Sequence, residues 1–296
     1  MLSEQSVVNE RTHSEAPIEQ RITLSHHLSL TALIWGDASA PPLLALHGWL
    51  DNAGSYAFLA PKLAERFRVI ALELPGHGHS SHLPAGISYH YVDYVSAVLS
   101  AADALGLERY TLLGHSLGAG IASLAAAATP QRIDRLLLIE GLGPLGDDGS
   151  NTLQRFRDAY AAPAASGKSL RLFANVDQAI SARTLASGLR ADLARPIVER
   201  GLAHVEGGYR WRSDPRLTRP SAVRLAEGQI RVLLAGIEAP SSLLLSTPVT
   251  PYLPSAMMEA RAQLVPRIAV THMEGGHHLQ LEHPDTVADW LFGCLS

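Results

Sequence analysis

A five-residue segment, Gly-His-Ser-Leu-Gly at positions 114–118, constrains the fold of this chain more than any other feature. It follows the apolar run 110–113 and precedes an alanine-rich stretch, 119–128, that is typical of a helix. A strand, Gly-x-Ser-x-Gly and a helix in this order predict a nucleophile elbow, a turn so sharp that its central residue holds strained backbone angles. The glycines on either side keep the strand and helix backbones from clashing. We therefore expect the Ser116 hydroxyl to be exposed at a helix N-terminus, where negative charge is favoured.

Around this segment, short apolar runs alternate with segments of helical spacing. The predicted strands cover 21–24, 28–35, 43–46, 69–72, 110–113, 136–139, 242–245 and 268–270, and the predicted helices cover 55–66, 91–105, 119–128, 257–264 and 284–295. Short buried strands that alternate with helices indicate a parallel sheet covered on both faces. The pattern therefore predicts an α/β fold with a mostly parallel, eight-stranded sheet.

The alternation stops after Glu140 and resumes at about residue 240. The segment between is rich in arginine, alanine and short helical stretches. An insertion of this kind between strands of a parallel sheet is typical of a cap over the carboxyl ends of the strands, where such sheets place their sites. We expect an N-terminal extension at 1–17, a core formed by 18–142 and 240–296, and a helical cap at 143–239, inserted after the sixth strand.

Composition excludes several classes of protein. The net charge of −4, with no basic run of five or more, gives no attraction to nucleic acid or to an anionic membrane. The single cysteine, Cys294, cannot form an internal disulfide. The first twenty residues are polar and lack the apolar core of a secretory signal, and the longest apolar runs are near ten residues. We therefore expect a soluble, cytoplasmic protein.

A serine hydroxyl becomes a useful nucleophile when a histidine takes its proton and a carboxylate orients that histidine. In elbow architectures the chain order is serine, acid, histidine. Two adjacent histidines, His277 and His278, follow a double glycine between the last predicted strand and the last helix. We expect His277 to be the base, because the glycines let its loop fold back toward Ser116, while His278 packs against the cap or faces solvent.

The acid is harder to place. It commonly follows the penultimate strand, but the residues there, 246–250, read Ser-Thr-Pro-Val-Thr and contain no carboxylate. The strand after the elbow helix ends instead in Glu140, and a carboxylate emerging from four apolar residues needs a partner because burying it alone is costly. We therefore expect Glu140 to be the acid. A structural role for Glu140 is the alternative, and Asp147 and Asp148, in a glycine-rich stretch, are the other candidate acids.

An acyl-transfer intermediate needs two backbone donors for its oxyanion. One donor is expected to be the amide of Leu117, directly after the candidate nucleophile. The other is expected in the turn after His47-Gly48, most simply the amide of Trp49, because this turn directly follows the third predicted strand.

Three further histidines, His77, His79 and His82, resemble a metal-ligand run, but a Leu-Pro-Gly-His-Gly-x-Ser loop accounts for them without a metal. We expect no metal site and no cofactor.

Four segments match the landmarks of the α/β-hydrolase superfamily in order and spacing. They are His-Gly-Trp-Leu-Asp-Asn at 47–52, Leu-Pro-Gly-His-Gly-His-Ser at 74–80, Gly-His-Ser-Leu-Gly at 114–118 and Gly-His-His-Leu-Gln-Leu-Glu-His-Pro at 276–284. The chain resembles this superfamily over nearly its whole length past residue 20, and the first segment, with the Glu140 placement, is most similar to the serine hydrolase-like subgroup. The family's base aligns with His277.

This resemblance implies the α/β-hydrolase fold and the activity of an esterase-like serine hydrolase. The expected substrate is a small-molecule carboxylic ester or related acyl compound, which is cleaved through an acyl-enzyme intermediate. The resemblance implies no metal and no organic cofactor. Two alternatives remain open. Some members of the fold cleave carbon–carbon bonds with the same serine, and others bind small molecules without hydrolysing them. Neither the substrate nor the oligomeric state can be predicted from the residues.

Overall fold

The computed structural model describes residues 16–24, 28–161 and 171–295, so most of the expected extension at 1–17 lies outside the described residues. Its central sheet is formed by β1 (Ile18–Thr23), β2 (Ser29–Trp35), β3 (Pro42–Leu46), β4 (Arg68–Glu73), β5 (Tyr110–His115), β6 (Ile133–Ile139), β9 (Ser241–Thr247) and β10 (Ile268–Glu274). The order across the sheet is β1-β2-β4-β3-β5-β6-β9-β10. Strand β2 is antiparallel to β1 and β4, and the remaining neighbours are parallel. The predicted mostly parallel, eight-stranded sheet is confirmed.

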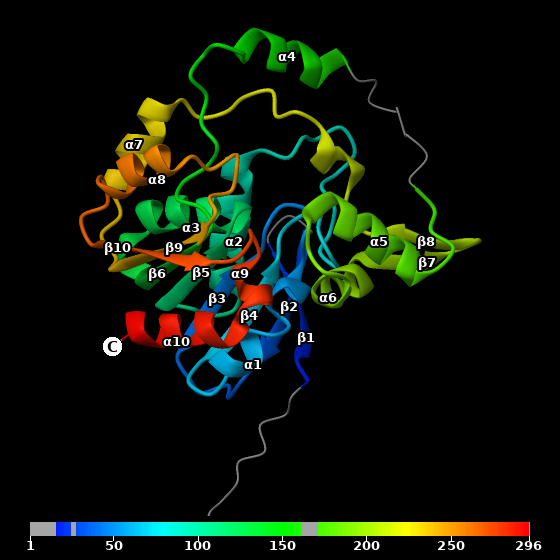
Figure 1. Cartoon of the computed structure of the whole chain (residues 1–296), viewed down its shortest axis with the longest axis horizontal. Helices are drawn as coiled ribbons and strands as arrows, with labels where there is room; N and C mark the ends of the chain where they lie inside the picture. The colour runs from blue at the N-terminus through cyan, green and yellow to red at the C-terminus, as the bar shows by residue number, and fades with distance from the viewer. Residues whose placement is uncertain (1–15, 25–27, 162–170, 296) are drawn as a thin grey trace, which may run out of the picture.

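Helices cover both faces of this sheet because successive strand side chains point in opposite directions. On β3, Leu44 and Leu46 join the core formed with α2 (Tyr91–Ala104), α3 (Leu117–Ala128), α7 (Glu227–Ala235) and α8 (Ser255–Ala262). Leu43 and Ala45 join the opposite core, with α1 (Ala60–Leu63), α9 (Leu279–Glu282) and α10 (Pro284–Cys294). Figure 1 shows α10 and α1 on the side of the sheet away from α3. The strands read as continuous apolar runs for this reason.

The single helix predicted over 55–66 is wrong. The structure has a 3₁₀ turn, η2 (Ala53–Tyr56), followed by the short helix α1. Pro61 lies inside the predicted helix and has no amide hydrogen to donate to the carbonyl of Ala57, so a continuous helix loses a hydrogen bond there. The side chain of Asn52 caps the 3₁₀ turn by accepting from the amide of Gly54 at 2.9 Å.

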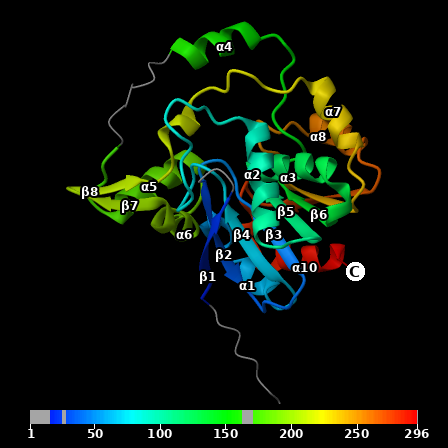
Figure 2. The same cartoon turned by 180° about the vertical axis from the view of Figure 1, so that it is seen from behind.

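The segment between β6 and β9 contains more than the predicted helices. It includes α4 (Thr152–Ala161), α5 (Val176–Ser187), α6 (Ala191–Gly201), β7 (Leu202–Val205), β8 (Gly208–Trp211), η4 (Pro215–Thr218) and α7. Strands β7 and β8 pair as an antiparallel hairpin whose turn needs Gly207 at a φ of +82°. Figures 1 and 2 show α5, α6 and this hairpin grouped beside the sheet, with α4 apart from them. No helix among the described residues has the length and apolar character to cross a bilayer.

Two arginines attach α5 and α6 to the core. Arg183 of α5 forms an ion pair with Asp51 in the loop after β3. Arg200 of α6 makes a two-pronged contact with Glu73, the last residue of β4, through Nε at 2.6 Å and Nη2 at 3.0 Å. Both carboxylates are buried, so each depends on its arginine to offset the cost of desolvation. Helices α5 and α6 therefore lie over the carboxyl ends of β3 and β4.

Candidate active site

Ser116 lies at a strained turn between β5 and α3, with φ +52° and ψ −113°. The glycines around it allow three backbones to approach one another. A methyl group at Gly114 would lie 2.5 Å from the carbonyl oxygen of Gly118, and one at Gly118 would lie 2.1 Å from the carbonyl oxygen of Leu46. The elbow therefore brings the start of α3 against the end of β3. The amide of Leu117, in the first turn of α3, has no partner within the helix.

Strained backbone angles gather at this edge of the sheet. Among the described residues, the non-glycine residues with positive φ are Leu50 at +59°, Ser116 at +52° and Glu140 at +54°. They follow β3, β5 and β6, at the carboxyl edge of the sheet. Such angles cost free energy and persist where the surrounding structure enforces them, which is common at functional sites.

Glu140 and His277, which are 137 residues apart in the chain, lie side by side. Oε2 of Glu140 is 3.0 Å from Nδ1 of His277, and the Glu140 side chain is buried. A neutral imidazole that donates from Nδ1 to this carboxylate keeps a lone pair on Nε2, the atom that acts as a base. The structure therefore brings together the predicted acid and the predicted base.

The segment after β9 holds Glu140 in place. The amide of Ser246 donates to Oε1 of Glu140 at 2.5 Å, and the hydroxyl of Thr250 donates to Oε2. Burial alone would raise the pKa of the Glu140 carboxyl, but the hydrogen bonds from His277, Thr250 and Ser246 outweigh it, so the pKa is lowered and the ionised form is favoured. The segment without a carboxylate therefore supplies hydrogen-bond donors to the predicted acid, Glu140, at the end of the neighbouring strand.

His278 points away from Glu140. Its buried ring places Nε2 3.2 Å from Oδ2 of Asp51, which also accepts from the hydroxyl of Ser55 at 2.8 Å. Burial would raise the pKa of Asp51, but the charge of Arg183 and the contact with His278 hold it well below its usual range. His278 therefore packs in the core beneath the inserted segment, in contact with the residue that anchors α5.

The loop after β3 lies beside the elbow. His115, directly before Ser116, donates from Nε2 to the carbonyl oxygen of His277 at 2.8 Å and so connects the elbow to the loop that carries the predicted base. The indole of Trp49 donates to the carbonyl of Leu217 at 3.1 Å, so Trp49 links this loop to the inserted segment. The amide of Trp49 belongs to the loop after β3 and that of Leu117 to the start of α3, and the close approach at Gly118 holds the end of β3 against the start of α3.

Tyr252 is a site residue that the sequence analysis missed. Its ring packs edge-on against His277, with ring centroids 5.3 Å apart. Burial and the negative charges of Glu140 and Asp51 raise the pKa of Tyr252 to about 12, while its hydrogen bond with the Ser116 side chain acts in the opposite direction. Tyr252 therefore contacts both the predicted nucleophile and the predicted base. Its half-exposed position in the loop after β9 carries no periodic signal that could have indicated this.

The other candidate residues have partners elsewhere. Asp147 pairs with Arg155 and accepts from Thr152, which lowers its pKa to about 2, and Asp148 accepts from Ser150. The three histidines of the possible metal-ligand run diverge. His77 donates to the carbonyl of Pro75, His79 contacts Glu19, and His82 contacts the carbonyl of Arg212 and the carboxylate of Asp214.

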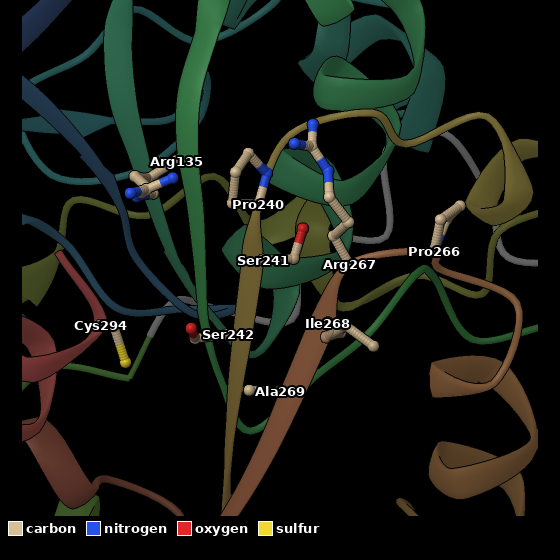
Figure 3. Close-up of a pocket in the computed structure, with 9 residues that line it drawn as sticks. All are labelled: Arg135, Pro240, Ser241, Ser242, Pro266, Arg267, Ile268, Ala269 and Cys294. Atoms are coloured by element: carbon tan, nitrogen blue, oxygen red, sulfur yellow. The ribbon is translucent and has the colours of Figure 1, made fainter. Parts of the chain in front are cut away.

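Two hollows lie in different parts of the molecule. One, of about 280 Å³, lies between the core and the inserted segment, and its walls include Leu50, Asp51, Arg183, Ala186 and Trp211. The other lies at the opposite edge of the sheet, where Figure 3 shows Arg135, Arg267 and Cys294 around the first residues of β9 and β10. The first of these hollows adjoins the loop after β3 through Leu50, Asp51 and Asn52.

Comparison with known proteins agrees with the fold. The family model described as the alpha/beta hydrolase fold matches residues 41–284. A serine hydrolase-like protein of Dictyostelium discoideum is 30% identical over 280 residues, which is 90% of this chain and 78% of that protein. The crystal structure of a hypothetical protein from Pseudomonas aeruginosa PAO1 matches with a TM-score of 0.86 and 40% identity, covering 94% of this chain and 98% of that one. A thioesterase domain from the curacin biosynthetic pathway matches in fold, with a TM-score of 0.81, 24% identity and coverage of 94% and 99%.

Proposed function

The chain belongs to the α/β hydrolase fold family and to its serine hydrolase-like subgroup, and we propose that it hydrolyses a carboxylic ester or related acyl compound through Ser116, His277 and Glu140. The observation that carries this proposal is the 3.0 Å contact between Glu140 Oε2 and His277 Nδ1. It supplies the orienting carboxylate that a serine–histidine pair needs.

The proposed reaction has two halves. The oxygen of Ser116 attacks the acyl carbon while its proton moves to Nε2 of His277, and Glu140 stabilises the resulting imidazolium. The amides of Trp49 and Leu117 donate to the oxyanion that forms. The intermediate then expels the alcohol, which takes the proton from His277 and leaves an acyl group on Ser116. Water attacks this acyl group by the same route, so the acid is released and Ser116 regains its proton. Each proton moves among substrate, water and these residues, and the scheme needs no cofactor.

We propose that the inserted segment acts as a cap over this site. This proposal is supported by two ion pairs, Arg183 with Asp51 and Arg200 with Glu73, which hold α5 and α6 over the carboxyl ends of β3 and β4. Between the cap and the core lies the hollow of about 280 Å³, whose lining is mostly apolar. Leu50, which lies in the loop that supplies the proposed Trp49 donor, lines this space, and we infer that the acyl chain on Ser116 enters it. The proposed substrate class is therefore an ester whose acyl group is apolar and of modest length.

The test combines covalent labelling with turnover. The wild type should react with a fluorophosphonate probe and release p-nitrophenol from short p-nitrophenyl esters, and Ser116→Ala should do neither while keeping its circular dichroism spectrum. Loss of turnover is expected on the order of 10⁴-fold or more, because attack and proton transfer act as a unit. A Ser116→Ala variant that keeps most of the esterase activity would refute the proposal. Labelling without ester turnover would instead favour a carbon–carbon bond hydrolase, and tight binding of an apolar molecule with neither would favour a binding protein.

A further inference from the structure

A second cluster of titratable side chains lies beside the proposed active site. Asp51, His115 and His278 come from the loop after β3, the end of β5 and the loop before α9, and all three are buried. One possible ligand atom from each residue lies within 4.8 Å of the other two. Oδ2 of Asp51 is 3.2 Å from Nε2 of His278 and 3.9 Å from Nδ1 of His115. The reaction proposed above uses none of these three atoms.

His115 has a buried ring nitrogen without a hydrogen-bond partner among the described residues. Because its Nε2 donates to the carbonyl of His277, the neutral ring has a lone pair on Nδ1. That Nδ1 is buried and has no hydrogen-bond partner among the described residues, and it faces the carboxylate of Asp51. Two electron-rich atoms that face each other in a buried site are stabilised by a cation between them. A histidine that binds a metal through one nitrogen and donates from the other to a carbonyl is the common arrangement in metalloproteins.

The space in this cluster fits a small ion. Gly48 leaves room between these groups, since a methyl group on it would lie 3.1 Å from both Oδ2 of Asp51 and Nδ1 of His115. Two ligands of a tetrahedral zinc ion, each about 2.0–2.1 Å from it, lie roughly 3.3–3.4 Å apart. Oδ2 of Asp51 lies 3.2 Å from Nε2 of His278 and 3.9 Å from Nδ1 of His115, which is close to this spacing. Small rotations of the two imidazoles would shorten the distances that exceed it. On the side of Asp51, the cluster adjoins the hollow that Asp51 and Arg183 line.

We propose that Asp51, His115 and His278 form a binding site for one divalent transition-metal ion of the Zn²⁺ or Co²⁺ class. Two imidazole nitrogens and one carboxylate oxygen favour such ions over Mg²⁺ and Ca²⁺, which prefer oxygen ligands. Binding requires His278 to move its proton from Nε2 to Nδ1, so the ion takes the place that this proton now occupies against Asp51. An ion held there fixes the loop before α9 and the turn at Gly48, and so restrains both the proposed base and the proposed oxyanion donors.

Arg183 opposes the metal. Its guanidinium contacts the other oxygen of Asp51, so the cap and the ion compete for the charge of one carboxylate. Removing this positive charge should tighten metal binding. This coupling would not be found for an ion bound at the protein surface, and it links occupancy of the site to the seating of α5 on the core.

The site is tested with tag-free protein titrated with Co²⁺ and, separately, with Zn²⁺ by calorimetry. The wild type should bind one ion per chain, and bound Co²⁺ should show the intense visible absorption of tetrahedral coordination. His278→Gln should weaken binding by about 100-fold or more, since even loss of a ligand's outer partner commonly costs 10- to 100-fold. Gly48→Ala keeps all three ligands but places a methyl group against Oδ2 of Asp51 and Nδ1 of His115, so it should weaken binding at least as much. Arg183→Gln should strengthen binding by roughly tenfold, since it removes a neighbouring positive charge.

The matched controls are His272→Gln, an exposed histidine on β10, and Ser116→Ala, and both should bind the ion as the wild type does. Because Ser116→Ala has no proposed nucleophile, failure of the esterase proposal leaves this test intact. Should a variant fail to fold, NMR of ¹⁵N-histidine-labelled wild type decides the question: Co²⁺ should broaden His115 and His278 first. A wild type that binds no ion, an octahedral Co²⁺ spectrum, or equal binding by His278→Gln would overturn the site.

Discussion

The hydroxyl of Thr250 donates to the same oxygen of Glu140 that lies against Nδ1 of His277. The acid in this architecture commonly follows the strand before the last, which here is β9. In this chain the loop after β9 supplies hydrogen-bond donors, and the carboxylate comes from the neighbouring strand β6. The proposed acid therefore follows a different strand, and its carboxylate contacts the proposed base at the carboxyl edge of the sheet.

Replacing the carboxylate of Glu140 by an amide should therefore impair catalysis and leave the shape unchanged. In Glu140→Gln we expect kcat/KM for a p-nitrophenyl ester to fall by roughly 10²- to 10⁴-fold, the range for losing an orienting acid. Asp147→Asn and Asp148→Asn are the matched controls and should change it little, because their carboxylates contact residues of their own loop and of α4, away from His277. If either control lost as much activity as Glu140→Gln, Glu140 would not be the acid.

The lowered pKa of Glu140 should make the effect of Thr250→Val on the free energy of unfolding depend on pH. A carboxyl whose pKa is lower in the folded state stabilises the fold above its unfolded pKa, and this contribution is lost as the pH falls through the folded pKa. The variant removes one of the donors that lower the pKa. At pH 7 we expect its free energy of unfolding to be about 1–2 kcal/mol below that of the wild type.

This difference should shrink once the pH falls below the lowered pKa and Glu140 is protonated in both proteins. Urea unfolding from pH 3 to pH 7 measures it. A difference that is the same at every pH would show that Thr250 acts by packing alone.

Substitution of the two adjacent histidines, His277 and His278, should affect ester turnover very differently. His277→Ala should be as inactive as Ser116→Ala, and the double variant should be no worse, because residues that act as a unit do not add. His278→Ala should keep substantial turnover but unfold more easily, by about 1–3 kcal/mol, because it leaves the buried carboxylate of Asp51 with one partner fewer. Turnover and urea unfolding of all four variants decide this, and the opposite ranking would move the base to His278.

The length of the acyl chain should depend on the hollow beneath α5. Ala186 lines it, and Ala186→Phe should reduce its volume. We expect kcat/KM to fall for p-nitrophenyl esters of six or more acyl carbons, by about 10-fold, and to stay unchanged for the acetate. Leu185→Phe is the matched control, because Leu185 is the neighbouring residue on α5 and is 89% exposed. An unchanged chain-length profile in Ala186→Phe would place the acyl group elsewhere.

Local patterns predicted much of this structure. The glycines around Ser116 and the strand that ends in Glu140 act through their immediate neighbours, so spacing along the chain was enough to place both residues at one edge of the sheet. The β7–β8 hairpin escaped prediction because its strands are only four residues long. The ion pair of Asp51 with Arg183 escaped because it depends on how the inserted segment packs. Tyr252 escaped because the path of its loop follows from neighbouring elements, and no periodicity encodes it.

The close approach at Gly118 gives a last prediction that separates the elbow from the acid–base pair. A methyl group there would lie 2.1 Å from the carbonyl oxygen of Leu46, so in Gly118→Ala the start of α3 must move away from the end of β3. We expect the free energy of unfolding to fall by about 1–3 kcal/mol. Fluorophosphonate labelling should also become slow, because the amide of Leu117 moves away from the loop that carries Trp49. The control is Gly228→Ala in α7, an exposed helical glycine with open space around it, which should gain about 0.5 kcal/mol and label normally. Wild-type labelling in Gly118→Ala would mean that the two loops need not touch for the oxyanion to be stabilised.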